Sequence, residues 1–259
     1  MKKIIVSISI ALCAILTSQA ATLDQQADSA YSADDFALAA SLYRQIMQDE
    51  GNSPQLYYNL ANCEYRLGNL GKAIVNYERA LRLDPTFTDA KTNLEFVNSR
   101  IVDRQGERGS FLSNTYDRFA LATTPNTWAW TAFILFTLAA GAIAAYFFSS
   151  NVLVRKTGFF GAIALIILFG ITQIIASRAK TIATDRNTAI ITAQSTILST
   201  SPREPKDRNE EAMLLHEGTK ITILDSISVP GDTTGLRWLD VQIDNTHRAW
   251  IKSTDIERI

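Results

Sequence analysis

Residues 57–85 read YYNLANCEYRLGNLGKAIVNYERALRLDP and decide the fold of the N-terminal part of the chain. Small residues, Ala73 and Ala80, stand where one helix can lie closely against another. Gly68 provides a turn between two helical stretches. Pro85 ends the second stretch, because its ring cannot continue a helix. The stretch therefore predicts a pair of closely packed helices.

The same pattern occurs once more upstream. Phe36, Ala39 and Tyr43 recur 34 positions later as Leu70, Ala73 and Tyr77. This period and its small residues resemble the tetratricopeptide repeat, in which helix pairs stack on one another. Residues 21–52 form a degenerate copy, and residues 88–104 read as one more amphipathic helix that caps the stack. For residues 21–105 we predict an all-α tetratricopeptide repeat region with its capping helix.

Stacks of this family bind peptides or partner helices on the concave face, which is lined by the first helix of each repeat. By their position in the repeat, the candidate partner-binding residues are Tyr31, Tyr58, Asn59, Asn62, Tyr65 and Arg66. Packing is the alternative role for the tyrosines, since aromatic side chains serve cores and interfaces alike. Chaperone-binding members clamp a carboxylate with basic residues, but Asp24, Asp28 and Asp89 stand at those positions here. We therefore expect no carboxylate clamp.

Two runs without charge follow, at residues 128–148 and 157–176. Each can cross a hydrocarbon core of about 30 Å as a helix. Neither contains an ionisable residue, so we expect an anchor and not a transport path. A two-helix transmembrane hairpin is the prediction. The predicted segments are a juxtamembrane linker (106–127), the first span (128–148), a loop (149–156), the second span (157–177) and a second linker (178–188).

The N-terminus has the layout of a secretory signal peptide. A basic start is followed by the apolar run 4–16 and by small residues before Ala21, so the predicted signal peptide is 1–20. Export of the repeats puts the 149–156 loop in the cytoplasm and both soluble regions on the periplasmic face of the inner membrane. The positive-inside rule leaves the orientation open, because basic residues follow both spans. An uncleaved anchor helix is the alternative, and it keeps the following segment on the outer face.

After Thr188 the pattern changes to short β-branched runs separated by turns. The predicted strands are Ala189–Ala193, Lys220–Asp225, Trp238–Asp244 and Arg248–Lys252, with a polar surface loop at 202–212. The order of Glu217-Gly218 before Lys220, then Trp238 and then Trp250 resembles bacterial SH3-like domains. For residues 189–259 we predict a small all-β SH3-like barrel. Trp238 and Trp250 are its candidate surface, and we expect at least one of them to lie in the core.

No pattern indicates catalysis. His216 and His247 lie in or beside predicted turns without partners at ligand or acid–base spacing, and we interpret them as solvated surface residues. Glycine-rich phosphate loops and nucleophile motifs are absent from the sequence. The chain carries 25 Lys and Arg against 26 Asp and Glu, which gives no reason to expect a nucleic-acid partner. We predict a non-enzyme without a cofactor.

The chain is thus multidomain, and its mean hydropathy of +0.02 averages soluble modules with apolar segments. The order of segments along the whole chain resembles the BatE family, the repeat proteins of Bat (aerotolerance) operons. The resemblance implies a scaffold in an envelope complex linked to aerotolerance and stress. It implies envelope partners, namely membrane-anchored von Willebrand factor A proteins and, indirectly, a MoxR-type AAA+ ATPase. The alternative is a cell-wall sensor whose SH3-like domain binds peptidoglycan.

Overall fold

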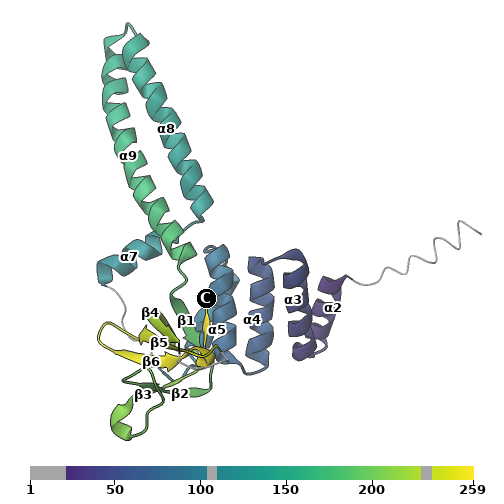
Figure 1. Ribbon diagram of the computed structural model, residues 1–259. Coiled ribbons are helices and arrows are strands. Elements are labelled where there is room, and N and C mark those ends of the chain that lie inside the picture. The colour runs from purple at the N-terminus through teal and green to yellow at the C-terminus, as the bar shows by residue number, and fades with distance from the viewer. Residues whose placement is uncertain (1–21, 104–109, 229–234) are drawn as a thin grey trace, which may run out of the picture. The chain divides into compact units, whose positions relative to one another are not determined.

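The computed structural model describes residues 22–103, 110–228 and 235–259 (Figure 1). The predicted signal peptide at 1–20 lies outside the described residues. The chain divides into two compact units, Met1–Asn52 and Ser53–Ile259. Two helices of the repeat region lie in the first unit, and the second unit contains all other helices and all described strands.

The first unit is a helical hairpin formed by α2 (Leu23–Ser32) and α3 (Phe36–Glu50). Thr22 begins α2 with a capping box, in which its side chain accepts from the Gln25 N–H and the Gln25 side chain accepts in return. Small side chains let the two helices approach closely. The buried residues are Ala27, Ala30, Ala39, Ala40, Tyr43 and Ile46. The degenerate copy is therefore a helix pair, as the sequence predicted.

In the second unit, α4 (Pro54–Arg66), α5 (Leu70–Leu83) and α6 (Thr88–Asn98) continue the helical region. The α4–α5 turn repeats the α2–α3 turn. Gly68 has a φ of 84°, and Asp34, which stands 34 positions earlier, has a φ of 60°. Glycine adopts this left-handed backbone without strain, and aspartate is among the residues that tolerate it. The 34-residue period is thus visible in the backbone as well as in the side chains.

Helix α6 is shorter than the sequence predicted. It ends at Asn98, whereas the apolar pattern continued to residue 104. Ile101 still packs against the cluster of buried residues in α4, α5 and α6, although it lies beyond the end of the helix. The helical spacing of Ile101 therefore predicted its place in the core correctly, but it predicted the end of α6 incorrectly.

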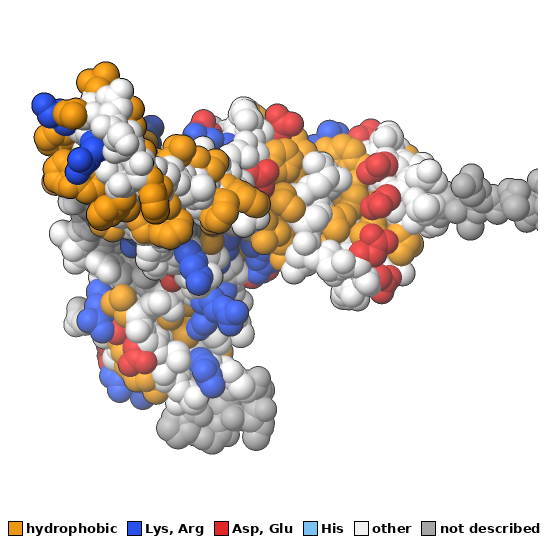
Figure 2. Space-filling view, turned by 90° about the horizontal axis from the view of Figure 1, so that it is seen from above, with side chains coloured by type: hydrophobic (Ala, Val, Ile, Leu, Met, Phe, Trp, Pro, Cys, Tyr) orange, Lys and Arg blue, Asp and Glu red, His pale blue; other side chains and the backbone are white. Residues whose placement is uncertain are grey.

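Two long apolar helices form an antiparallel hairpin (Figure 1), α8 (Pro125–Phe148) and α9 (Val152–Thr184). Each is long and apolar enough to cross a membrane. They pack through small side chains, with Ala132 and Ala139 of α8 and Ala162 of α9 buried. Many large hydrophobic side chains of the hairpin are exposed, and they form most of its surface on the face that Figure 2 shows. A short helix, α7 (Phe111–Ala120), precedes α8.

The C-terminal region is an antiparallel β-sheet. Its strands are β1 (Thr188–Ile191), β2 (Ser195–Ser199), β3 (Glu211–His216), β4 (Lys220–Ser228), β5 (Arg237–Gln242), β6 (Arg248–Lys252) and β7 (Ile256–Arg258). Apolar residues alternate along β4, where Ile221 and Ile223 are buried. They join Leu198, Val241 and Ile251 in one core cluster. The predicted change from helical to β structure after Thr188 is confirmed.

The predicted SH3-like barrel is not confirmed, because the sheet is not closed. Within the described residues the strand order is β3-β2-β6-β5-β4-β1-β7, which leaves β3 and β7 at the edges. β7 pairs with β1 and lies beside α5. A closed barrel has no edge strands, whereas here the helix α5 covers the edge strand β7. The polar insertion 202–212 contains the start of β3 at Glu211, which the sequence placed in a loop.

The sheet docks on the second helix of the repeat, α5. Arg79 of α5 pairs with Glu257 (Nη1 to Oε1, 2.7 Å), and Glu78 pairs with Lys220 (Oε1 to Nζ, 2.6 Å). Ile190 of β1 is fully buried in the same cluster as the apolar residues of α4, α5 and α6. Ion pairs therefore surround an apolar contact, and the repeat and the β-sheet share part of one core.

Candidate partner-binding surface

The candidate residues of α4 lie on one side of that helix. Tyr58, Asn62 and Tyr65 follow each other at spacings of four and three, and Asn59 and Arg66 lie next to them on the same side. All are half-buried except Arg66, which is exposed. Tyr31, the sixth candidate, belongs to the first compact unit. It is half-buried, and its ring meets that of Phe36 edge-on with centroids 5.2 Å apart.

A hydrogen-bond network occupies the middle of this face. The Tyr77 hydroxyl of α5 donates to Asn62 Oδ1. The Asn93 amide of α6 lies 3.1 Å from the same oxygen and 3.3 Å from the Tyr58 hydroxyl. The carbonyl oxygen of Asn62 therefore receives two donors from inside the protein, which fills its acceptor capacity. Asn62 therefore holds α4 to α5 and α6 through its carbonyl oxygen, and its amide nitrogen is the group that can contact a ligand.

The first unit repeats this bond at the equivalent positions. The Tyr43 hydroxyl donates to Asp28 Oδ1 at 2.6 Å. Tyr43 and Asp28 stand 34 residues before Tyr77 and Asn62. The tyrosine on the second helix of each pair thus holds a polar side chain on the first helix. The sequence showed the tyrosine period, and the same spacing applied to the polar residues would have identified both bonds.

The end of the face near the α4 C-terminus is aromatic and cationic. The Tyr65 ring meets the Phe96 ring edge-on, with centroids 5.8 Å apart. The Arg100 guanidinium carbon lies 4.3 Å from the Phe96 centroid and 5.9 Å from the Tyr65 centroid. Phe96 is 46% exposed. Tyrosine and arginine are enriched at the energetically dominant positions of protein interfaces, and here they flank an exposed phenylalanine.

Sequence reasoning missed the residues that α6 contributes. Asn93 and Arg100 stand 34 positions after Asn59 and Arg66, so both repeat candidate residues of α4. The amphipathic pattern alone predicts a capping helix here, although the segment occupies the place of the first helix of a further repeat. We define the groove surface as Tyr58, Tyr65, Arg66, Phe96 and Arg100, from α4 and from the segment that begins with α6.

The two tryptophans of the β-sheet lie differently. Trp238 of β5 is 4% exposed, whereas Trp250 of β6 is half-buried. One of the two is therefore a core residue, and the sheet offers one tryptophan, not two, to a ligand. An aromatic-lined groove for extended ligands requires more aromatic surface than this.

His216 is not the solvated residue that the sequence suggested. Its N–H donates to Asp103 Oδ2 at 2.6 Å, and its ring Nδ1 lies 3.0 Å from Asp103 Oδ1. The Thr219 hydroxyl donates to the same carboxylate at 2.7 Å. The partners are separated by 113 residues, so no local spacing could reveal them. Asp103 follows α6, and it therefore ties the helical region to the turn between β3 and β4.

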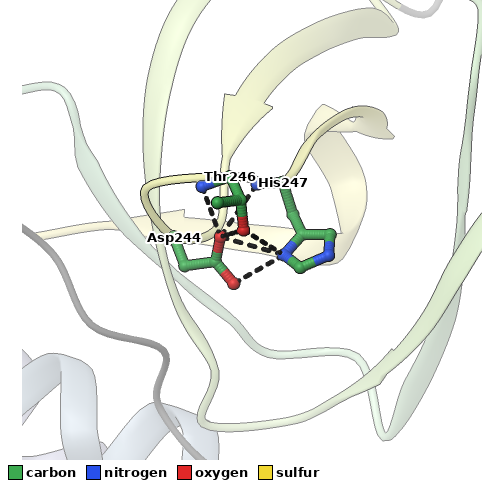
Figure 3. Close-up of polar contacts among 3 residues, drawn as sticks. All are labelled: Asp244, Thr246 and His247. Atoms are coloured by element: carbon green, nitrogen blue, oxygen red, sulfur yellow. Dashed lines mark hydrogen bonds and ion pairs between the residues drawn. The ribbon is translucent and has the colours of Figure 1, made fainter.

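His247 lies in the turn between β5 and β6 (Figure 3), and its side chain is 55% exposed. Asp244 Oδ1 accepts from the main-chain N–H groups of Thr246 and His247 at 2.7 and 2.8 Å, and its Oδ2 lies 2.7 Å from the His247 ring. Hydrogen bonds from the Thr246 N–H and the His247 ring hold the pKa of Asp244 far below its usual range. The aspartate organises the hairpin turn.

The carboxyl group of Asp103 makes the docking of the sheet sensitive to acid. Burial raises the pKa of Asp103, but the hydrogen bonds from His216 and Thr219 outweigh it and hold the pKa below its ordinary value. A lowered pKa in the folded state means that these contacts stabilise the protein fully above about pH 4, the ordinary range of an aspartate. The stabilisation is lost as the pH falls through the lowered pKa.

We therefore expect the free energy of unfolding of Asp103→Asn to fall less steeply with decreasing pH than that of the wild type. In urea unfolding of the detergent-solubilised protein, the wild type should lose stability from about pH 4 downward more steeply than Asp103→Asn. Asp89→Asn, which removes an exposed carboxylate of α6, is the matched control and should follow the wild type. Equal acid slopes for the wild type and Asp103→Asn would contradict the assignment.

Among the described residues, no group of three or more His, Cys, Asp or Glu side chains is arranged to hold a metal ion. The contacts described above are hydrogen bonds, ion pairs and ring contacts within the helical region and between α5 and the β-sheet.

Comparisons with known proteins agree with this reading of the helices. Residues 54–87 match the tetratricopeptide repeat family. Over 74 residues the chain is 35% identical to the Protein SGT1 homolog of Oryza sativa subsp. japonica. That match covers 29% of this chain and 20% of the rice protein, so the chain spans about a fifth of the length of this relative. Helices α4 and α5 form a tetratricopeptide repeat.

Proposed function

We propose that this protein is a membrane-anchored scaffold that binds partner proteins on the groove surface. The observation that carries the proposal is the group of half-buried Tyr65 with exposed Phe96 and Arg100 on the first-helix side of a tetratricopeptide repeat. Aromatic and arginine side chains dominate the binding energy of protein interfaces. The β-sheet docks on α5, the second helix of the repeat, through Gly71, Glu78 and Arg79, and the groove residues of α4 belong to the first helix.

The two apolar helices serve as the anchor in this proposal. The contacts between α5 and the β-sheet require that the repeat and the C-terminal region lie on the same side of any membrane. An even number of crossings meets this requirement, and α8 and α9 supply two candidate spans between the two regions. On the layout of residues 1–20, we assign that side to the periplasmic face of the inner membrane.

The partners in this proposal are envelope proteins of the Bat system. The order of repeat, spans and β domain along the chain supports it, because the same order characterises the BatE family. Membrane-anchored von Willebrand factor A proteins are the direct partners that we propose, with a MoxR-type AAA+ ATPase acting through them. The β domain serves as an SH3-like module that positions the repeat, since Arg79 and Glu78 engage it directly.

Truncation of the groove surface is expected to release these partners. We expect a Tyr65→Ala, Phe96→Ala double variant to bind von Willebrand factor A proteins at least about 30-fold more weakly, because two hot-spot residues are worth about 2 kcal/mol or more. The measurement is affinity purification of the full-length protein from solubilised native membranes, with quantitative mass spectrometry. Leu83→Ala, which removes an exposed leucine of α5, is the control and should retain binding. Equal recovery by the double variant would refute the groove assignment, and wild-type protein recovered alone would refute the scaffold.

A further inference from the structure

Helix α7 is held against the end of α9 by polar contacts. Arg178 of α9 donates from Nε and Nη2 to both carboxylate oxygens of Asp117, at 2.6 and 2.9 Å. The Tyr116 hydroxyl donates to the main-chain oxygen of Ile174 at 2.9 Å. A two-point ion pair fixes orientation as well as distance. Helix α7 therefore has a defined position at this end of α9.

The start of α8 contributes to the same arrangement. The Trp128 indole N–H donates to the main-chain oxygen of Ala120 at 3.0 Å, which ties the C-terminal end of α7 to α8. The Phe119 and Trp128 rings lie 5.7 Å apart. Ala120 is buried with Ile175 and Ala179 of α9. Helix α7 thus contacts both helices of the hairpin at the end opposite their connecting loop.

The attachment point coincides with the end of the apolar part of α9. Residues 157–176 carry no charge, and Arg178 and Lys180 are the first charged residues after them. A bilayer that covers the uncharged run ends near these side chains, which reach the headgroup region. Since Asp117 of α7 pairs with Arg178, α7 lies at the level of the bilayer surface.

Large apolar side chains of α7 are exposed at this level. Phe111 is 82% exposed, Leu112 77% and Phe119 55%. Soluble proteins rarely leave such a group of large apolar residues on one short helix uncovered. The apolar surface of α8 and α9 (Figure 2) adjoins it through the contact of Phe119 with Trp128. Whatever covers the apolar surface of α8 and α9 can therefore also cover Phe111, Leu112 and Phe119 of α7.

We infer that α7 is an interfacial helix, which inserts Phe111, Leu112 and Phe119 into the surface of the bilayer crossed by α8 and α9. This inference rests on the proposed membrane anchoring. The occupant of the apolar patch is lipid, with acyl chains against these three side chains and headgroups near Arg118 and Lys180, which are exposed. Apolar side chains on one part of a helix and polar residues elsewhere are the pattern of helices that lie in this plane. Helix α7 then sets the depth of the hairpin in the membrane.

Spin labels test this placement in the full-length protein. The two native cysteines are replaced by alanine, and single cysteines are introduced as Leu112→Cys, Asn114→Cys and Ile167→Cys. Each labelled protein is reconstituted in vesicles of phosphatidylethanolamine and phosphatidylglycerol. Power-saturation electron paramagnetic resonance then compares collisions with oxygen, which concentrates in lipid, and with a water-soluble nickel chelate. Asn114 is an exposed polar residue of the same helix and serves as the matched control.

The expected ratio of oxygen to nickel collisions is several-fold higher at residue 112 than at residue 114, and highest at residue 167. The Ile167 label tests the anchoring itself, because Ile167 lies exposed in the middle of the uncharged run. Water exposure at residue 167 would overturn the membrane proposal. A lipid signal at residue 167 together with equal ratios at residues 112 and 114 would overturn the interfacial helix alone.

Discussion

Replacement of Gly71 with leucine is expected to detach the β-sheet from the repeat. A Cβ atom on Gly71 would lie 2.6 Å from the main-chain oxygen of Ile191 and 3.2 Å from Thr192 Cα. Both are backbone atoms of the β domain, so no side chain can move aside to make room. The Gly71 N–H also donates to Glu217 Oε2 at 3.0 Å, and displacement of the sheet breaks this bond. We expect a loss of about 3 kcal/mol or more from overpacking and the broken contact.

The change in stability caused by Gly71→Leu has opposite signs with and without the docked sheet. Gly71 is the second residue of α5, and leucine is a better helix former than glycine, by less in the first turn than the roughly 0.8 kcal/mol of a helix interior. Without the docked sheet, Gly71→Leu should therefore stabilise the repeat. Lys72→Leu introduces the same side chain at the exposed neighbouring position and should be nearly neutral.

Two measurements on the full-length protein in detergent separate these cases. Urea unfolding gives the change in stability, and hydrogen exchange gives the protection of the Gly218 N–H, which donates to the Ile191 oxygen beside Gly71 at 2.8 Å. Detachment of the sheet should lower both the stability and the protection of the Gly218 N–H in Gly71→Leu. Lys72→Leu should change neither quantity. A stabilised Gly71→Leu variant with unchanged protection would show that the sheet does not dock on α5.

The periodic parts of this fold could be predicted from the sequence. The repeat is recognisable from a fixed spacing of 34 residues, because Ala39 and Ala73 occupy the same place in two helix pairs. The long apolar helices follow from composition alone, since few soluble helices contain so many uncharged residues in one run. Such features depend on local order, which a linear sequence displays directly.

The contacts between distant segments could not be predicted in this way. Asp103 and His216 meet across 113 residues, and Gly71 touches Glu217 across 146. Neither pair has a spacing that the sequence could show, because the docking of the sheet on α5 brings them together. The same docking covers the β7 edge of an open sheet, whereas the resemblance to SH3-like domains implies a closed barrel. Among the site residues, the repeat position of Asn62 predicts a place on the first-helix face, but its bond to Tyr77 is visible only in three dimensions.

Tyr77 is expected to be the side chain of the repeat whose truncation costs most stability. It is almost fully buried, and its ring packs 6.0 Å from that of Tyr58 while its hydroxyl donates to Asn62. We expect Tyr77→Ala to cost about 3–5 kcal/mol, as truncation of a buried aromatic side chain usually does. Tyr77→Phe keeps the ring and removes only the hydrogen bond, so it should cost about 1 kcal/mol.

The matched control for the hydrogen bond is Tyr43→Phe in the first unit. Its acceptor, Asp28, is exposed and recovers its hydrogen bond from water, so this variant should cost less than Tyr77→Phe. Urea unfolding of each variant checks the order of the costs. Equal costs for the two phenylalanine variants would show that Asn62 does not depend on Tyr77.

The same variants separate structure from binding on the groove face. If both acceptor sites of Asn62 serve Tyr77 and Asn93, Asn62→Ala should lower stability by about 1–3 kcal/mol, because it leaves two internal donors without their acceptor. Tyr65→Ala should do the reverse and weaken partner recovery more than it lowers stability, since the Tyr65 ring lies at the exposed end of the groove surface. Loss of partners by Asn62→Ala with unchanged unfolding would instead make Asn62 a contact residue. Stability and binding must therefore be measured on both variants before any residue of α4 is assigned to the partner.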